Sequence, residues 1–232
     1  MTAFVDQATR TQAHQGTGTQ AHQGTGTPAD QGIRIRTLHR EPQESQRDFT
    51  VLLDVLSRPG RVRRLDAPEF APTAAVAACG LGDVEVPTLV LAEDGDLWAE
   101  AVHAATGAPR ATAATARAVV VLRPLTDEDV RSLPRGDALN PELGARIFAR
   151  VESLAEGEHP ADDALVLALT GPGVREENRL TVRGLSRDTV TALVEANSSF
   201  PLGVDTFLAA RDGSVAGLPR TTRVRVVADG GA

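Results

Sequence analysis

Lysine and tyrosine are absent from the 232 residues, so every one of the 24 basic side chains is an arginine. A chain without lysine cannot form a Schiff base with pyridoxal phosphate (PLP) or with a carbonyl substrate. It also lacks the lysine that a P-loop places on the phosphates of a nucleotide. Lysine-dependent PLP and aldolase chemistry and a Walker-type nucleotide site are therefore excluded, and we expect no cofactor.

Cysteine and tryptophan each occur once, and aromatic side chains make up only 3% of the chain. The lone Cys79 cannot form a disulfide within the chain, and it fits a reducing compartment, which predicts a cytoplasmic protein. Cys79 lies in an alanine-rich run, which predicts a small buried side chain. No apolar run reaches the length of a membrane span, and the N-terminus lacks a signal-peptide core. We therefore expect no membrane association.

The charge balance is acidic, with a net charge of −7 and 24% charged residues. Hydrophobic residues make up 41%, which is typical of a soluble globular protein of one domain. The densest basic spot is Arg61, Arg63 and Arg64, for which we predict a solvated loop after a helix. Because no longer basic run occurs, the composition argues against nucleic-acid binding.

The N-terminal segment, residues 1–36, reads as a low-complexity tail. The octapeptide QAHQGTGT occurs at residues 12–19 and again, unchanged, at residues 20–27. Such a repeat has too little apolar surface to offset its ordering entropy, so we expect disorder. Each unit contains one histidine, His14 or His22. Single histidines in a flexible repeat are a weak set of metal ligands. The predicted domains are this tail, one α/β domain at residues 37–228, and a short C-terminal tail at residues 229–232.

Helical and β-type patterns alternate along the domain. The first helix is predicted to begin at Ser45, with Asp48 as its acidic N3 partner, and to end at residues 57–60 (SRPG). Further helices are predicted at residues 73–81, 97–105, 125–133, 142–154 and 186–195, the last capped by Ser186. Strands are predicted at residues 61–65, 87–92, 116–122, 164–170, 179–183, 204–210, 214–218 and 222–226. This order predicts an α/β domain of three layers with a mixed β-sheet.

The last strands are joined by recognisable turn chemistry. The pair Asp212-Gly213 predicts a tight type I′ hairpin turn. In the strand that follows Pro219, Val224 and Val226 share one face, and Arg223 and Arg225 share the other. That alternation is typical of an edge strand, and we predict that it is an interaction surface.

The glycine-rich turn Gly171-Pro172-Gly173 follows a buried strand, where backbone N–H groups can bind an anion. Its spacing matches neither GxGxxG nor GxxxxGK[ST]. Close packing of the backbone explains the two glycines equally well, so both interpretations stay open.

Arg220, Thr221 and Thr222 carry the best local chemistry in the chain. A guanidinium beside two hydroxyls suits a phosphate or phosphonate oxyanion, and the alternative is a structural arginine that clamps Asp205 or a neighbouring chain. Glu176, Glu177 and Asp205 have the chemistry of general acids or bases. The alternative for the two glutamates is a solvated turn or a salt bridge to Arg179, and the alternative for Asp205 is a buried carboxylate paired with a backbone N–H or an arginine. No triad order and no metal-ligand spacing occurs, so we assign neither catalytic residues nor metal ligands.

Three segments resemble the PhnH family, a subunit of the bacterial carbon–phosphorus (C–P) lyase system for phosphonate use. Residues 200–205 (FPLGVD) with residues 218–222 (LPRTT) look like the family's C-terminal signature. Residues 49–60 look like its first helix, with the terminal S-x-P-G. Residues 169–179 (LTGPGVREENR) look like its LTGxGI…E segment. The resemblance extends from about Ser45 to Val227 and keeps the family's order of motifs.

The resemblance implies a fold like that of PLP-dependent transferases without PLP, and a homodimer within a complex with PhnG, PhnI and PhnJ. It implies that this complex transfers an alkylphosphonate to the ribose C1′ of a purine nucleoside triphosphate and displaces the base. The expected role of this chain is a non-catalytic or accessory subunit. The alternative is a stand-alone phosphonate- or nucleotide-binding enzyme or sensor that uses Arg220, Thr221 and Thr222.

Overall fold

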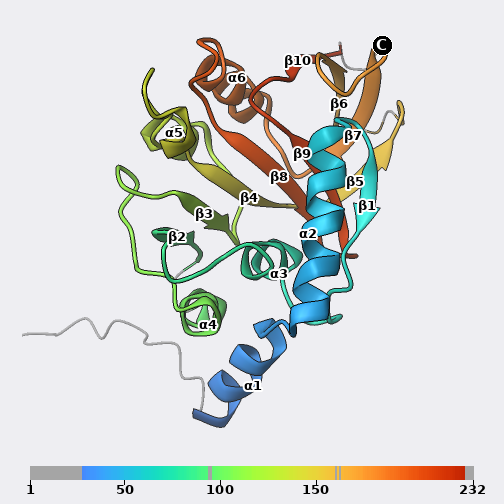
Figure 1. The fold of residues 1–232 in the computed structure, drawn as a ribbon. Coiled ribbons are helices and arrows are strands. Elements are labelled where there is room, and N and C mark those ends of the chain that lie inside the picture. Colours follow the sequence, from blue (N-terminus) through green and yellow to red (C-terminus); the bar gives the residue numbers. More distant parts are fainter. Residues whose placement is uncertain (1–27, 94–95, 160, 162, 228–232) are drawn as a thin grey trace, which may run out of the picture.

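A computed structural model describes residues 28–93, 96–159, 161 and 163–227 of the chain (Figure 1). The helices are α1 (Pro28–Leu38), α2 (Pro42–Ser57), α3 (Thr73–Cys79), α4 (Leu97–Thr106), α5 (Asp127–Ser132), α6 (Arg187–Ala196) and the 3₁₀ turn η1 (Pro141–Leu143). The strands are β1 (Val62–Arg64), β2 (Thr88–Leu91), β3 (Ala118–Val121), β4 (Arg146–Val151), β5 (Ser153–Glu156), β6 (Ala164–Thr170), β7 (Asn178–Arg183), β8 (Asp205–Ala210), β9 (Ser214–Leu218) and β10 (Arg223–Val226).

Two sheets organise the domain. The larger has the order β1-β9-β8-β4-β3-β2, in which β2, β3, β4 and β8 run parallel to one another and β9 pairs antiparallel with both β8 and β1. The smaller is antiparallel, with the order β10-β6-β7-β5. The prediction of an α/β fold with a mixed sheet is confirmed. The chain adds a second sheet, and β10 belongs to it rather than to the mixed sheet.

Both faces of the large sheet are covered, because its central strands are apolar on both sides. Helices α2, α3 and α4 pack on one face, where Val120, Phe148 and Phe207 are buried. The two phenylalanine rings stack there, with centroids 5.1 Å apart. Helices α5 and α6 and the small sheet pack on the other face, against Val119 and Ile147. Figure 1 shows this order of layers.

Helix α1 was not predicted, because the helix expected first along the chain corresponds to α2. Residues 28–36, which we expected in the tail, belong to α1, which ends at the fully buried Leu38. Apolar residues at helical spacing in this segment give it a buried side that the QAHQGTGT repeat lacks. The repeat itself, with His14 and His22, lies outside the described residues.

Helix α2 does not begin at Ser45. It begins after Glu41, with Pro42 at its first position, and the Glu44 carboxylate accepts a hydrogen bond from the Glu41 N–H (2.9 Å). Asp48 is instead buried within the helix and paired with Arg40 (2.8 Å). The prediction was wrong because the capping residues are glutamates, which are weaker N-cap signals than serine. The predicted helix end at residues 57–60 is confirmed.

The helix predicted at residues 142–154 is also wrong. This segment forms η1, β4 and β5, and β4 is the centre of the large sheet. Its residues Ile147, Phe148 and Ala149 are buried in succession. A strand buried on both faces loses its alternating pattern, so periodicity alone does not distinguish it from a helix.

The hairpin between β8 and β9 uses a different turn from the one predicted. A type I′ turn needs a positive φ at both central residues. Gly213 has a φ of 91°, but no non-glycine residue in the described part of the chain has a positive φ. The Gly213 N–H donates to Ala210 O (3.1 Å), which gives a three-residue loop with glycine at its left-handed position.

No helix among the described residues is both long and apolar enough to cross a bilayer.

Candidate functional site around Asp205 and Arg220

Arg220 and Asp205 form a bidentate ion pair. The Arg220 Nε and Nη2 atoms donate to Asp205 Oδ2 at 3.1 and 2.8 Å, and the Arg220 backbone N–H donates to Oδ1 at 2.9 Å. Nη1 donates to the carbonyl oxygens of Pro141 (2.7 Å) and Pro201 (3.4 Å). The side chains of Arg220 and Asp205 are only 14% and 22% exposed. The Arg220 guanidinium, in the loop before β10, thus joins that loop to the start of β8 and to η1. This is the arginine clamp on Asp205, one of the two roles that the sequence allowed for Arg220.

The two threonines line a groove beside this clamp. The groove has a volume of about 510 Å³, and its floor includes Arg220, Thr221 and Thr222. Thr222 is buried, and its hydroxyl oxygen has no hydrogen-bond partner among the described residues. At the rim, Phe200 is 65% exposed, and Val194 of α6 is also exposed. Arg220 and both hydroxyls are therefore brought together, but the guanidinium is directed to Asp205 and backbone carbonyls.

Gly171 and Gly173 lie where two backbones meet. Gly171 has a φ of 127°, and a Cβ atom added to it would lie 2.9 Å from Thr221 O. Gly173 has a φ of 80°, and an added Cβ would lie 2.0 Å from Ser57 O. Close packing of the backbone therefore accounts for both glycines without a ligand. Anion binding at these glycines stays a prediction.

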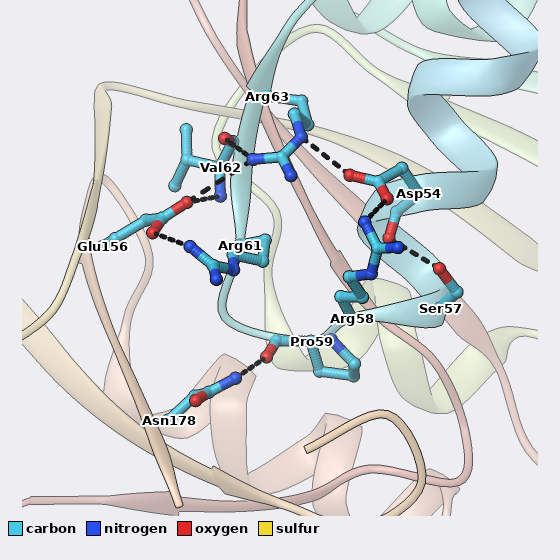
Figure 2. Close-up of polar contacts among 9 residues, drawn as sticks. All are labelled: Asp54, Ser57, Arg58, Pro59, Arg61, Val62, Arg63, Glu156 and Asn178. Atoms are coloured by element: carbon cyan, nitrogen blue, oxygen red, sulfur yellow. Dashed lines mark hydrogen bonds and ion pairs between the residues drawn. The ribbon is translucent and has the colours of Figure 1, made fainter. Parts of the chain in front are cut away.

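The end of α2 contacts the small sheet at the start of β7, directly after the turn that holds Gly171 and Gly173. The Asn178 side chain donates to Pro59 O (2.7 Å), as Figure 2 shows, and a Cβ added to Gly60 would lie 2.7 Å from the Asn178 Cβ. Residues 169–179 thus contact both residues 57–60 and residues 218–222, which are far away in the chain. The resemblance rests on these segments, and their shared task is to join the helix, the small sheet and the C-terminal loop.

The strand predicted at residues 61–65 is confirmed as β1 (Val62–Arg64), so Arg63 and Arg64 do not lie in the solvated loop that we also predicted for this basic spot, and Arg61 directly precedes the strand. Figure 2 shows Arg63 beside Asp54 and Arg61 beside Glu156. The Glu156 carboxylate of β5 accepts from the Val62 N–H (2.9 Å) and from Arg61 (3.1 Å), while Arg63 pairs with Asp54 of α2 (2.7 Å). These ion pairs connect the edge of the large sheet to the small sheet, because opposite charges on three elements face one another there.

Glu177 is held by ion pairs. Its carboxylate contacts Arg179 (2.8 Å) and Arg225 of β10 (3.2 Å). The salt bridge to Arg179, which was the structural alternative for this glutamate, is confirmed. Glu176 is exposed on the same turn.

Strand β10 lies at the edge of the small sheet, as predicted. The Val227 N–H donates to Val166 O of β6 (2.8 Å), so in an antiparallel ladder the N–H groups of Val224 and Val226 point away from β6. Arg223 is exposed, and no described residue pairs with its side chain. The strand therefore presents free backbone donors beside an unpaired arginine and next to the groove.

Asn197 is a site residue that the sequence reasoning missed. Its side-chain oxygen accepts from the Val204 N–H (2.7 Å) and lies against Gly203, where an added Cβ would be 2.4 Å away. It fixes the residue 200–205 loop to the end of α6. The only signal in the sequence was an asparagine at a helix end, which is common and unspecific.

Other reactive groups are few in the described ranges. Burial raises the pKa of the Cys79 thiol to about 12, so the thiol is protonated at neutral pH. No group of three or more His, Cys, Asp or Glu side chains in the described part of the chain could hold a metal ion.

Comparison with known proteins agrees with the motifs. The family model described as "Bacterial phosphonate metabolism protein (PhnH)" matches residues 37–225. The chain is 35% identical over 188 residues to HtxG of Stutzerimonas stutzeri, which is named as a candidate C-P lyase subunit. That alignment covers 78% of this chain and 86% of HtxG. The Asp205–Arg220 clamp and the glycine contacts thus lie within the matched region, and the chain belongs to the PhnH family of bacterial phosphonate metabolism proteins.

Proposed function

We propose that this protein is an accessory subunit of a C–P lyase complex, without catalytic activity of its own. The complex would transfer an alkylphosphonate to the ribose C1′ of a purine nucleoside triphosphate and displace the base. The observation that carries this proposal is the similarity over most of the chain to HtxG, which is named as a candidate C-P lyase subunit. The family match over residues 37–225 supports the same process.

The accessory role is supported by what the motif residues do. The donors of Arg220 are directed to Asp205, Pro141 O and Pro201 O, so a ligand oxyanion would have to displace internal partners. Gly171 and Gly173 pack closely against the backbone of Thr221 and Ser57, respectively. These contacts favour a structural role for the candidate residues over the stand-alone enzyme or sensor that would bind its ligand through Arg220, Thr221 and Thr222.

Strand β10 and the neighbouring groove form the proposed contact surface for other subunits. An edge strand with outward N–H groups can accept a strand from a partner. Exposed Phe200 and Val194 would supply an apolar anchor beside it. The partners we propose are PhnG, PhnI and PhnJ, together with a second copy of this chain.

Two further expectations belong to the proposal. The mixed sheet with helices on both faces is compatible with a PLP-transferase-like fold, and the lysine-free sequence supports a role without PLP. The single cysteine supports a reducing compartment, for which we propose the cytoplasm.

Reconstitution of the reaction tests the accessory role. We would combine purified PhnG, PhnI and PhnJ with a purine nucleoside triphosphate and methylphosphonate, with and without this chain, and follow the phosphonate by ³¹P NMR. The proposal predicts product with all subunits, a large loss when this chain is omitted, and none from this chain alone. Product formation by this chain alone would contradict the proposal.

A further inference from the structure

A second cavity, separate from the Arg220 groove, lies at the carboxyl ends of parallel strands. It has a volume of about 240 Å³ and is lined on the sheet side by Leu122, Arg150, Ala209 and Arg211. Leu122 directly follows β3, Arg150 lies near the end of β4, and Arg211 directly follows β8. In open α/β sheets, the crevice outside the carboxyl ends of the strands is the usual place for a ligand.

Two arginines line this cavity, and both have side-chain N–H groups without a partner among the described residues. Arg150 is in register with Ala209 on β8, so Arg211, two residues further on, projects to the same face of the sheet. Within the described residues the Arg211 side chain has no hydrogen bond or ion pair. Arg150 uses only Nη1, which donates to Leu122 O (3.1 Å). Adjacent guanidinium groups with free donors match the oxygens of a phosphate or phosphonate.

The opposite wall contains a buried polar group without a partner. Thr73, at the start of α3, lines the cavity and is 2% exposed. Its hydroxyl oxygen has no hydrogen-bond partner among the residues that the structure describes. A buried hydroxyl without a partner is destabilising, but this oxygen is closed off from solvent, so it would meet a ligand oxygen only after the Thr73 side chain rotates.

The remaining walls are aromatic and acidic. Phe70 is 62% exposed, and its ring lies 6.5 Å from that of Trp98, so the pair offers an apolar surface to the organic part of a ligand. The Asp96 carboxylate is already used, because it accepts from the Trp98 N–H (2.9 Å) at the start of α4. Glu69 is exposed and pairs with no described residue, so its charge opposes an anion in the same cavity.

We propose that this cavity binds a small organic phosphate or phosphonate. Its phosphorus oxyanion would lie between Arg150 and Arg211, and its organic group against Phe70. The site does not depend on the subunit role, because all of its residues belong to one chain and lie away from the Arg220 groove. The ligand could be a free alkylphosphonate or the phosphate chain of a nucleotide, which present the same oxyanion.

Trp98 reports on this site directly, since it is the only tryptophan in the chain. We would titrate the full-length protein with inorganic phosphate, methylphosphonate and ATP in parallel, following Trp98 fluorescence and the heat of binding. The proposal predicts a saturable response to at least one of the two organic probes. Tighter binding of methylphosphonate would identify a free phosphonate as ligand, and tighter binding of ATP would identify a nucleotide.

Variants distinguish this site from general charge attraction. Arg211→Ala should weaken binding by about tenfold, because one charge-assisted contact is lost. Arg211 has no partner within residues 28–227 as the structure describes them, so this variant should fold normally. Glu69→Gln should strengthen binding several-fold. Arg175→Ala, at an exposed arginine outside the cavity, is the matched control and should change nothing. The proposal is overturned if no organic probe binds at millimolar concentration, or if Arg211→Ala binds as tightly as the natural sequence.

Discussion

Arg220 and Asp205 make the single pair of side chains on which the C-terminal loop most depends. Replacing Arg220 by alanine would leave the Asp205 carboxylate mostly buried and without its counter-charge. Removing one partner of such a pair costs about 3 kcal/mol in the free energy of unfolding. We expect a loss of this size for Arg220→Ala in urea denaturation, and the double variant Arg220→Ala/Asp205→Ala should lose less than the sum of its two single variants.

The matched control is Arg225→Ala, which breaks the more exposed ion pair with Glu177. Surface pairs of this kind contribute at most about 1 kcal/mol. If Arg220→Ala destabilised the protein no more than Arg225→Ala does, the clamp would not have the structural role that we assign to it.

At the residue scale, the sequence predicted that Arg220 contacts a negatively charged group. It did not show whether that group is the oxyanion of a ligand or a carboxylate of the protein. An arginine beside two threonines suits an oxyanion, and it suits an internal carboxylate equally well. Asp205 is 15 positions from Arg220, and the hairpin of β8 and β9 brings the two together. No local pattern encodes that contact, so the sequence left both roles open. Arg150, Arg211 and Thr73 come from separate segments and share no motif, which is why the second cavity was not foreseen.

At the scale of elements, helix α5 contains the clearest pH-dependent contact. Asp129 accepts from the Thr126 N–H (3.0 Å) and from two nitrogens of Arg123 (2.7 and 2.8 Å). Burial raises the pKa of Asp129, but the hydrogen bonds from Arg123 and Thr126 lower it by more, so the net pKa lies below its ordinary value. The stabilisation is therefore complete above the unfolded-state pKa of about 4 and is lost as the pH falls through the folded-state pKa.

Asp129→Asn tests this contact. It should reduce the free energy of unfolding by about 1–2 kcal/mol at neutral pH, because the capping and charge-assisted hydrogen bonds weaken. The difference from the natural sequence should shrink as the pH falls below about 4, where the carboxyl becomes protonated in the unfolded chain, and vanish as the pH passes the lower folded-state pKa. Urea midpoints at both pH values measure it. Glu128→Gln, at an exposed position of the same turn, should have little effect at either pH. A deficit that grew toward acid pH would reverse the sign of the linkage.

Elements with a local signal were predicted correctly. Helix α6 has its cap at Ser186, whose hydroxyl accepts from the Thr189 N–H (3.1 Å), and the apolar runs at β3, β6 and β8 are strands. Strand β4 was mistaken for a helix because burial on both faces hides its period. The start of α2 was misplaced because glutamates, rather than Ser45, supply its cap.

At the scale of the whole molecule, the assignment of strands to two sheets was beyond the sequence. Residues 205–226 pass from the large sheet through Pro219 to the small one, and nothing in their alternation indicates that change. The passage leaves β10 at an edge next to Phe200, which is why we propose this surface for subunit contact.

The central claim is that the chain works inside a hetero-oligomer, and native mass spectrometry tests it most directly. We would express the tagged chain with PhnG, PhnI and PhnJ and weigh the purified product. Arg223→Glu would test the β10 edge, with Arg110→Glu, at an exposed arginine on the loop after α4, as control. We predict a stoichiometric hetero-oligomer for the natural sequence and the control, and loss of partners for Arg223→Glu. A lone chain or homodimer that leaves all three partners behind would contradict the account.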